Sequence, residues 1–518
     1  MALAKILWAD DEIENLQSQR IFLESKGYEV QTFTNGFDAI DYVKDNAVDV
    51  VLLDESMPGI TGLETLAKIK EINPMVPVVM ITKNETENLM EEAIGSQITD
   101  YLIKPVNPNQ VLHSLKKILD NRRLVAEKTT QQYQEQFRNL FMALNSNPDH
   151  NEWMDIYKKL VYWELEMEKS DSPEMQEVLQ AQKSEANTEF FKFISKNYSS
   201  WINKKTKDVP VMSHTLFTEK VLPTLEKGIP TFFLIIDNLR LDQWKAIQPI
   251  FSEHFRILEE DTFYSILPTA TQYCRNAILA GLMPIDIEKQ YPSQWKNDDE
   301  EGGKNLFEDE FFKGQLKRHR RDDIKSSYTK VVHYNDGQQL VNNIHNLLGN
   351  DLNVIIYNFV DMLSHARTEM EVLKELASDE ISYRSITKSW FEHSALFQAL
   401  KKISDKKINI VLATDHGSIR VNTPYKVIGD KQTTTNLRYK HGRNLNYEPK
   451  EVLAFRNPQE VGLPVPNLNS SFIFAKEDGF LCYPNNYNYF VNYYRNTFQH
   501  GGVSLEEMII PVVKMTSK

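Results

Sequence analysis

The sequence predicts an α/β protein in which a helical segment separates two sheet-containing regions. One observation is a series of short apolar runs near the N-terminus that end in polar residues, KILWADD, VDVVLLD, VPVVMIT and DYLIK. A second is three later apolar runs, FFLII, VIIYNFV and INIVLAT, each of which leads to an aspartate. Strands that deliver a carboxylate at their C-terminal ends are typical of α/β sheets, because ligands collect outside those ends. The third is the stretch from Gln110 to Asn147, which lacks proline and glycine and repeats apolar residues at helical spacing.

Length and composition limit the class of protein. At 518 residues the chain is long enough for roughly two to four domains. Its 2 cysteines, Cys274 and Cys482, argue against a disulfide framework and fit a reducing compartment. Charged residues from Lys5 onward interrupt any candidate signal peptide, and no apolar run is long enough for a membrane span. We therefore expect a cytoplasmic protein, and the net charge of −13 disfavours non-specific binding to duplex DNA.

Five polar residues at the ends of the first apolar runs form a candidate phosphorylation site. They are Asp10, Asp11, Asp54, Thr82 and Lys104. A hard cation such as Mg²⁺ prefers carboxylate oxygens and retains several waters. A cation is also needed because the attack of a carboxylate on a phosphoryl donor brings anions together. The alternative is that the aspartates only cap strand ends and turns.

This pattern closely resembles a phosphoacceptor receiver domain over residues 1–120. The resemblance implies a flavodoxin-like fold and a sensor histidine kinase that phosphorylates Asp54. It also implies that Asp11 and Asp54 bind Mg²⁺ with support from Asp10. Thr82 and Lys104 would contact the phosphoryl oxygens, and the aromatic Tyr101 would reorient on phosphorylation.

A three-helix bundle is expected at residues 121–205. The receiver's last helix is expected to run on into this region, and amphipathic segments follow at Glu152–Lys169 and Pro173–Tyr198. The aromatic residues of these segments fit core and interdomain packing better than a ligand site. No DNA-reading helix is recognisable in the sequence.

The C-terminal region, residues 206–518, has a candidate nucleophile. In SILPTATQYCRN, Thr271 stands where a turn leads into an apolar helical pattern. A helix N-terminus attracts anions through its unpaired N–H groups, and a hydroxyl beside a metal ion becomes a nucleophile. Taken alone, a threonine here is more often an ordinary N-cap.

Carboxylates and imidazoles in the same region supply ligands for two borderline-soft metal ions, most plausibly zinc. Asp361 is followed four residues later by His365, Asp415 is followed at once by His416, and His500 precedes two glycines. Each has a simpler alternative: a surface pair on a helix, a strand-end turn and a loop residue, respectively.

The order Asp237, Thr271, Asp361, His365, Asp415, His416, His500 resembles the alkaline phosphatase superfamily, and the flanking PTATQYCRNAILAG and HGGVSLEEMIIPVV resemble its PglZ branch. The resemblance implies an alkaline-phosphatase-like α/β domain with two Zn²⁺ ions. Asp361, His365 and His500 would hold one ion. Asp237, Asp415, His416 and the Thr271 oxygen would hold the other.

In this reading Thr271 attacks phosphorus, and further donors stabilise the phosphoryl charge. Candidates for these donors are Arg275, Asn276, Lys440, His441 and Arg443. The metal ligands do not distinguish a phosphodiesterase from a phosphomonoesterase. The stretch YPNNYNYFVNYYRN favours nucleotide or oligonucleotide phosphodiesters, because its aromatic residues are able to stack bases.

The succession of receiver, bundle and PglZ domain resembles the PorX-like response regulators, which are associated with type IX secretion. The resemblance implies partners among secretion components or a sigma factor. Alternatives are a non-catalytic signalling adaptor and a transcriptional regulator, of which the second is disfavoured by the acidic balance of the chain. Because isologous pairing is common, we expect phosphorylation to shift a monomer toward a homodimer.

Overall fold

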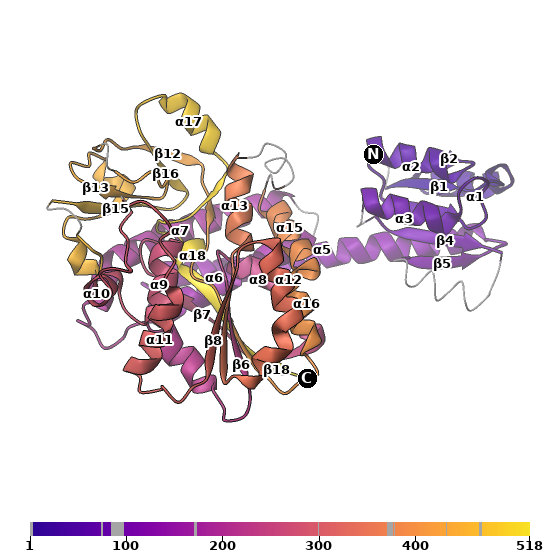
Figure 1. Cartoon of the computed structure of the whole chain (residues 1–518). Helices are drawn as coiled ribbons and strands as arrows, with labels where there is room; N and C mark the ends of the chain where they lie inside the picture. Colours follow the sequence, from indigo (N-terminus) through magenta and orange to yellow (C-terminus); the bar gives the residue numbers. More distant parts are fainter. Residues whose placement is uncertain are drawn as a thin grey trace. The chain divides into compact units, whose positions relative to one another are not determined.

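The structure is a computed structural model (Figure 1). It describes residues 4–73, 76–83, 98–169, 173–298, 300–369, 377, 379–430, 433–465 and 469–518, with the backbone alone at 120–128, 173 and 365–369. The chain forms two compact units, Met1–Gln132 and Tyr133–Lys518. Among the described residues, no helix has both the length and the apolar character needed to cross a bilayer.

The first unit is a flavodoxin-like receiver fold. Its parallel sheet has the order β2-β1-β3-β4-β5, in which the chain starts in the middle and reverses direction once. The central strands are fully buried apolar runs, as expected for a parallel sheet covered on both faces. The elements are β1 (Lys5–Ala9), α1 (Gln17–Ser25), β2 (Glu29–Phe33), α2 (Gly36–Asp45), β3 (Val50–Asp54), α3 (Gly62–Ile72), β4 (Val78–Thr82), β5 (Asp100–Ile103) and α5 (Pro108–Leu144).

Helix α5 confirms that the receiver's last helix continues beyond the first unit, since it ends at Leu144. It is followed by α6 (His150–Lys169) and α7 (Pro173–Ile202). Their buried aromatic residues belong to the same hydrophobic core as the C-terminal region. For example, the ring of Trp201 lies 5.5 Å from that of Tyr264 on β7. The boundaries at 121–205 and 206–518 stay predictions, because the described helices and the C-terminal region share one compact unit.

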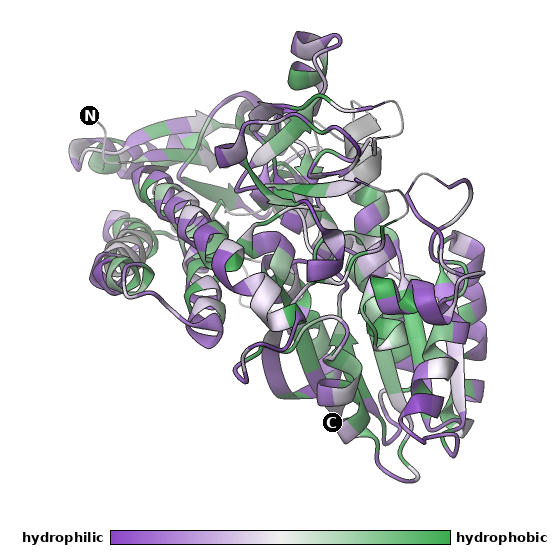
Figure 2. Cartoon of the chain, turned by 90° about the vertical axis from the view of Figure 1, so that its left-hand side faces the viewer, coloured by the Kyte–Doolittle hydropathy of each residue, from purple (hydrophilic) through white to green (hydrophobic). Residues whose placement is uncertain are grey.

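The second unit is built on a six-stranded sheet of order β7-β18-β10-β6-β9-β8. Four strands are parallel: β6 (Thr231–Ile236), β8 (Ser326–Val331), β9 (Leu352–Tyr357) and β10 (Asn409–Ala413). β18 (Ile509–Ser517) runs antiparallel to β10 and to β7 (Phe255–Tyr264). The hydropathy colours of Figure 2 mark the strands of this sheet as hydrophobic. Its two faces pack into separate apolar clusters.

Helices cover this sheet, and three small sheets lie beyond the carboxyl ends of its parallel strands (Figure 1). The helices are α8 (Leu241–His254), α9 (Thr271–Ala280), α10 (Pro284–Gln290), α11 (Glu308–Arg318), α12 (Tyr334–Asn343), α13 (Phe359–Glu369), α15 (Glu380–His393), α16 (Ala395–Lys402), α17 (Tyr487–Tyr494) and α18 (Leu505–Met508). The small sheets pair β11 (Ile419–Arg420) with β17 (Phe498–Gln499), β12 (Thr423–Lys426) with β16 (Gly479–Cys482), and β15 (Ser471–Ala475) with β13 (Tyr439–Gly442) and β14 (Val452–Phe455).

One sequence expectation needs correction at the β9 strand. The run VIIYNFV was expected to be a strand that ends in Asp361, but β9 stops at Tyr357 and α13 begins at Phe359. Asp361 therefore lies in the first helical turn rather than at a strand end. The apolar pattern extends past the strand because Val360, the last apolar residue before the aspartate, is buried on the helix.

Candidate functional site

The receiver unit brings the predicted aspartates together. Asp10 follows β1, Asp54 ends β3, and oxygens of Asp10, Asp11 and Asp54 all lie within 4.8 Å of one another. Asp10 and Asp54 are buried, whereas Asp11 is exposed. The cluster consists of hard oxygen ligands and is open to solvent at one side, which suits a hydrated Mg²⁺ ion.

Lys104 supplies the compensating charge in this cluster. Its Nζ lies 2.9 Å from Asp10 Oδ2 and 2.8 Å from Asp54 Oδ1. Burial raises the pKa of Asp54 above its usual value despite this contact. Burial alone would lower the pKa of Lys104, but the hydrogen bonds to the two carboxylates raise it. Thr82 Oγ1 donates to Glu55 Oε2, and Tyr101 is half-buried on β5.

The second unit assembles a carboxylate–imidazole group at the ends of its central strands. β6 ends one residue before Asp237 and β10 ends two residues before Asp415, and these two strands are neighbours in the sheet. Ligand atoms of Asp237, Asp415 and His416 lie within 4.8 Å of one another, and all three residues are completely buried. The sheet therefore concentrates two carboxylates and an imidazole at one point.

Arg275, on α9, balances this buried charge. Its Nη1 lies 2.6 Å from Asp237 Oδ2 and 3.6 Å from Asp415 Oδ2, and its Nε donates to Glu308 Oε1 at 2.6 Å. Burial would raise the pKa of Asp237, but the arginine charge and His416 lower it. Burial and the neighbouring Asp237 raise the pKa of Asp415 well above its usual range.

Asp415 provides the test of whether this group fits a cation. Its Oδ1 accepts hydrogen bonds from the backbone N–H groups of Asn238 at 3.2 Å and His416 at 3.1 Å. Its buried Oδ2 accepts no hydrogen bond within the described part of the chain. Arg275 Nη1, at 3.6 Å, is beyond hydrogen-bond distance of this oxygen. A buried carboxylate oxygen without a hydrogen-bond donor, beside a second carboxylate and an imidazole, is costly, and a bound metal ion would offset that cost. The residues present therefore fit a metal ion.

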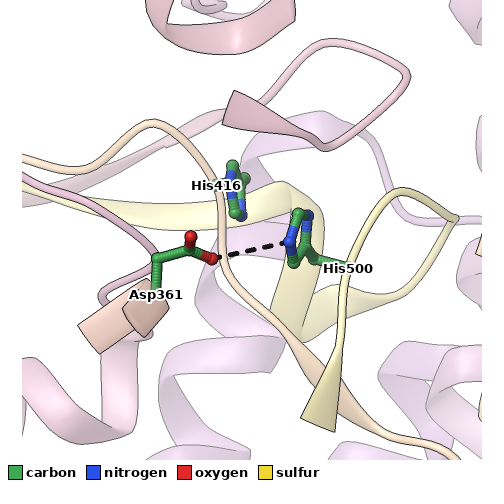
Figure 3. Close-up of side chains that lie close together, drawn as sticks. All are labelled: Asp361, His416 and His500. Carbon is green, nitrogen blue, oxygen red and sulfur yellow. Dashed lines mark ion pairs between the residues drawn. The ribbon is translucent and has the colours of Figure 1, made fainter. Parts of the chain in front are cut away.

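A second group shares His416 with the first (Figure 3). It consists of Asp361, His416 and His500, whose ligand atoms also lie within 4.8 Å of one another. His500 Nε2 is 3.5 Å from Asp361 Oδ1, and the two imidazole rings stack with centroids 4.2 Å apart. The Asn238 side chain donates to Asp361 Oδ1 at 3.4 Å, which links the two groups.

Backbone carbonyls fix the orientation of both imidazoles. His416 Nδ1 lies 3.0 Å from Gly417 O, and His500 Nδ1 lies 3.1 Å from Thr269 O. Because a carbonyl oxygen only accepts, each Nδ1 carries a proton, and in the neutral ring the lone pair is then on Nε2. This is the arrangement that prepares a histidine for metal binding through Nε2.

Thr271 lies at the same point and does not act as a helix cap. It is the first residue of α9, whose N-cap is Ala270 and has no side-chain cap. Thr271 Oγ1 lies 3.0 Å from His416 Nε2 and 3.4 Å from Asp237 Oδ1. The hydroxyl therefore faces the ligand group, and the uncapped first turn of α9 begins beside it.

Other predicted site residues have different surroundings. His365 is on α13, but its side chain lies outside the described residues. The Asn276 amide donates to Lys304 O at 3.2 Å, and Lys440 Nζ donates to Thr434 O at 3.1 Å and lies over the Tyr483 ring. His441 stacks on Phe472 with ring centroids 4.3 Å apart, and exposed Arg443 lies 3.9 Å from Asp430. A substrate-binding role for Asn276, Lys440, His441 and Arg443 stays a prediction.

Three residues of the site were not foreseen. Asn238 adopts a positive φ of 61°, which asparagine tolerates, and its position directly after Asp237 was a usable signal. Glu308 binds Arg275, and Asn358 Oδ1 accepts from Arg275 Nη1 at 3.2 Å. Neither of these contacts leaves a local pattern in the sequence.

Comparison with known families agrees with the predicted order of domains. Residues 6–116 match the response regulator receiver domain, and residues 123–202 match the PorX response regulator linker domain. Residues 216–515 match the family described as the BREX system PglZ alkaline phosphatase-like domain.

Similar individual proteins match about a quarter of the chain. Transcriptional regulatory protein ZraR of Klebsiella oxytoca is 34% identical over 132 residues, which cover 26% of this chain and 30% of that protein. Response regulator UvrY of Escherichia coli (strain K12) is 33% identical over 25% of this chain and 61% of that protein. The chain thus spans less than two thirds of the length of either relative.

Among solved structures, a CheY-like receiver domain protein from Methanospirillum hungatei JF-1 is 28% identical over 23% of this chain and 96% of that chain, with a TM-score of 0.23. A receiver domain protein from Clostridium thermocellum is 31% identical over 24% and 98%, also with a TM-score of 0.23.

Proposed function

The chain belongs to the PglZ alkaline phosphatase-like family, and from this premise we propose that its second unit is a zinc-dependent phosphodiesterase under the control of the receiver. The observation that carries the proposal is the position of Thr271. Its hydroxyl lies 3.0 Å from His416 Nε2, at a helix N-terminus and beside two buried carboxylates. These are the parts needed for nucleophilic attack on a phosphate ester.

Two zinc ions are proposed, because imidazole and carboxylate ligands together suit a borderline-soft ion. Asp237, Asp415, His416 and Thr271 Oγ1 would hold one ion. Asp361, His500 and the predicted His365 would hold the other. When bound, the ions lower the pKa of the Thr271 hydroxyl and neutralise charge on the transferring phosphoryl group.

The protein's own groups then perform the remaining tasks. Thr271 Oγ1 loses its proton and forms a bond to phosphorus, while the bond from phosphorus to the ester oxygen breaks and the leaving alcohol takes up a proton. Water then hydrolyses the phosphothreonine, which releases the phosphate product and restores the Thr271 hydroxyl. The first-turn N–H groups of α9 attract the anionic phosphoryl group to this hydroxyl. Arg275 holds Asp237 through Oδ2, so that Oδ1 faces Thr271. Arg275 is thus proposed as a positioning residue rather than a direct phosphoryl contact.

We favour nucleotide-type phosphodiesters over monoesters because of helix α17. Tyr489 is 64% and Phe490 is 36% exposed on this helix, which ends six residues before His500. The Tyr489 and Tyr493 rings stack at 6.1 Å, and so do those of Phe490 and Tyr494. Exposed aromatic rings supply a surface on which bases stack without sequence preference. A phosphomonoesterase remains the second candidate, since the metal-site residues serve either reaction.

The enzyme proposal is tested with chromogenic and nucleotide substrates. We expect zinc-loaded protein to hydrolyse phosphodiesters faster than the corresponding monoesters. A His365→Ala/His416→Ala double variant should lose both zinc and activity, because His416 belongs to both ligand groups. Full zinc occupancy in this variant, measured by elemental analysis, would exclude the proposed site. A wild-type protein that binds zinc but hydrolyses no phosphate ester would favour the non-catalytic adaptor instead.

For the first unit we propose phosphorylation of Asp54 by a sensor histidine kinase, with Mg²⁺ held by Asp11 and Asp54. The support is the oxygen cluster and the contact of Lys104 with Asp54 at 2.8 Å. Asp54→Ala should abolish labelling by acetyl phosphate, because it removes the nucleophile and a magnesium ligand together. The exposed Asp41→Ala variant, altered on α2, serves as the control. Undiminished labelling of Asp54→Ala would refute the assignment.

The signalling output is proposed from the match to the PorX linker and from helix α5, which continues out of the receiver unit. We propose that phosphorylation shifts the chain toward a homodimer and that its partners include type IX secretion components or a sigma factor. A coupling of about 1–3 kcal/mol would change dimer affinity roughly five- to hundred-fold. Sedimentation across a concentration series with and without beryllofluoride measures this change, and equal dimerisation constants would contradict it.

A further inference from the structure

One face of helix α7 contacts the start of α18 and the turn before α9, and both segments are hydrogen-bonded to the loops that carry the candidate metal-binding histidines. We propose that Asn187 and Tyr198 on this face are positioning residues for the metal centre, so that the helical bundle is a working part of the catalytic unit. The proposal rests on the proposed function, because it concerns the same metal site.

The first contact joins α7 to α18. Asn187 Oδ1 accepts a hydrogen bond from Leu505 N at 2.8 Å, and its Nδ2 donates to Glu506 Oε2 at 3.1 Å. Lys183, one turn earlier on α7, places Nζ 3.6 Å from Glu506 Oε1. Asn187, Lys183 and Glu506 are all buried. One amide side chain therefore holds both the backbone and the side chain at the start of α18.

From α18 the contacts continue to His416. Gly417 N donates to Glu507 O at 3.2 Å. The backbones are so close that a Cβ atom on Gly417 would lie 2.0 Å from Glu506 O. Gly417 O in turn receives the proton of His416 Nδ1 at 3.0 Å. The position of α18 thus sets the carbonyl that orients the shared histidine.

α18 also holds the loop that carries His500. The buried carboxylate of Glu507 accepts from Gly502 N at 2.8 Å and from Arg438 Nη2 at 2.6 Å. Gly502 is only two residues after His500, and it follows Gly501, which has a φ of +123° and little freedom for a side chain. A displacement of α18 would therefore move both imidazoles.

The second contact of α7 lies beside the candidate nucleophile. The hydroxyl of fully buried Tyr198 accepts a hydrogen bond from Leu267 N at 2.8 Å. Two residues later, Thr269 O accepts from His500 Nδ1 at 3.1 Å, and Thr269 Oγ1 accepts from Gly501 N at 3.0 Å. Thr271 is two residues further along. Helix α7 therefore fixes the turn between β7 and α9. This turn leads to Thr271 and accepts the hydrogen bond that orients His500.

Packing alone does not explain these polar contacts. The ion pairs of Arg384 with Glu164 at 2.6 Å and with Glu168 at 2.9 Å already join the bundle to the rest of the unit. Asn187 and Tyr198 instead satisfy single backbone N–H groups of site loops, which are costly to leave buried without a partner. If Asn187 and Tyr198 only contribute to packing, their replacement should lower stability alone. If they position the histidines, their replacement should also change the geometry and affinity of metal binding.

The experiment follows Co²⁺ in the full-length protein, because the visible absorption of bound Co²⁺ reports ligand geometry without reference to activity. Asn187→Asp keeps the acceptor for Leu505 N but replaces the donor to Glu506 with a second carboxylate, which repels that of Glu506. Asn187→Asp/Glu506→Gln restores a donor and acceptor pair between the two side chains. Tyr198→Phe removes the hydroxyl while the ring still fills its space. Lys192→Met, which alters an exposed α7 ion pair with Glu189, is the matched control.

We expect Asn187→Asp and Tyr198→Phe to alter the Co²⁺ spectrum and to weaken Co²⁺ affinity by about tenfold, the lower end of the range for residues that orient metal ligands. The double variant should recover most of the affinity, and Lys192→Met should match wild type. Unchanged spectra and affinities in Asn187→Asp and Tyr198→Phe, or a loss without recovery in the double variant, would overturn the inference. A wild-type protein that binds no Co²⁺ would overturn the metal site as well, so the two failures are distinguishable.

Discussion

The two candidate metal sites use the same scaffold with different ligands and different burial. Both are formed where neighbouring parallel strands end, at Asp54 in the first unit and at Asp237 and Asp415 in the second. The receiver cluster has only oxygen ligands, an exposed Asp11 and a lysine as counter-charge. The second site adds imidazoles, is completely buried at Asp237, Asp415 and His416, and uses an arginine. Strand ends thus explain where a site forms, whereas ligand type and burial indicate which ion it selects.

Selective metal removal should separate the two sites most strongly. Because imidazole ligands suit zinc and oxygen ligands suit magnesium, a zinc-selective chelator should abolish phosphate ester hydrolysis while acetyl phosphate still labels Asp54 with Mg²⁺ present. Phosphoprotein gels and a hydrolysis assay on the same sample measure both effects. Loss of both hydrolysis and labelling would show that the two sites do not differ in the metal ion they require.

Replacement of the hydroxyl tests the chemistry of the second site alone. Thr271→Ala should leave metal content nearly unchanged but reduce turnover by several orders of magnitude, roughly a thousandfold or more, since the nucleophile is lost while Asp237, Asp415 and His416 remain as ligands. Thr271→Ser keeps the hydroxyl and is expected to retain measurable turnover. Near-normal hydrolysis by Thr271→Ala would mean that water attacks the phosphorus directly.

Replacement of Arg275, the counter-charge of the second site, should have a moderate effect on zinc affinity. Arg275 contacts Asp237 through Nη1 and Glu308 through Nε, a fork that lysine is unable to reproduce. Arg275→Lys should weaken zinc affinity by about 10- to 100-fold, as expected for a group that orients metal ligands. Zinc competition with a chelating dye measures the change. Arg443→Lys, at an exposed pair 3.9 Å from Asp430, should have no effect.

The smallest expected effect concerns the pH dependence of stability and follows from a comparison of Lys104 with Lys440. Lys104 contacts two carboxylates that raise its pKa, whereas burial without a carboxylate partner lowers the pKa of Lys440 to about 7. The folded state therefore disfavours the charged amine of Lys440, and its contribution to stability should increase as the pH rises from about 7 toward the usual 10.5.

Lys440→Met removes this titration, so its thermal midpoint relative to wild type should fall as the pH rises over that window. Thermal melts at several pH values measure this difference. A constant difference between the two proteins would instead favour a charged Lys440 that is available to bind phosphate.

The sequence predicted the parts of both sites that depend on local pattern. Apolar runs located β3, β6 and β10, and the carboxylates lie at or within two residues of their C-terminal ends. Asp361 was misplaced because β9 and the first two residues of α13, Phe359 and Val360, are apolar and are separated by Asn358 alone, so the run resembled one strand. The Arg275–Glu308 pair was missed because its members are 33 residues apart and meet only in the folded chain. The hydrophobic core shared by α6, α7 and the C-terminal region was likewise not predicted, because it depends on contacts between residues far apart in the sequence.

The N-cap of α9 implies a compromise between stability and activity. Ala270 occupies a position where serine or aspartate would accept a first-turn N–H group and typically add about 1 kcal/mol of stability. Such a side chain would satisfy the helix terminus with the protein's own oxygen and so compete with an anionic ligand beside Thr271. Proteins often give up stability where function requires an unsatisfied group. A thermostabilising design should therefore leave this helix uncapped and seek its gains elsewhere.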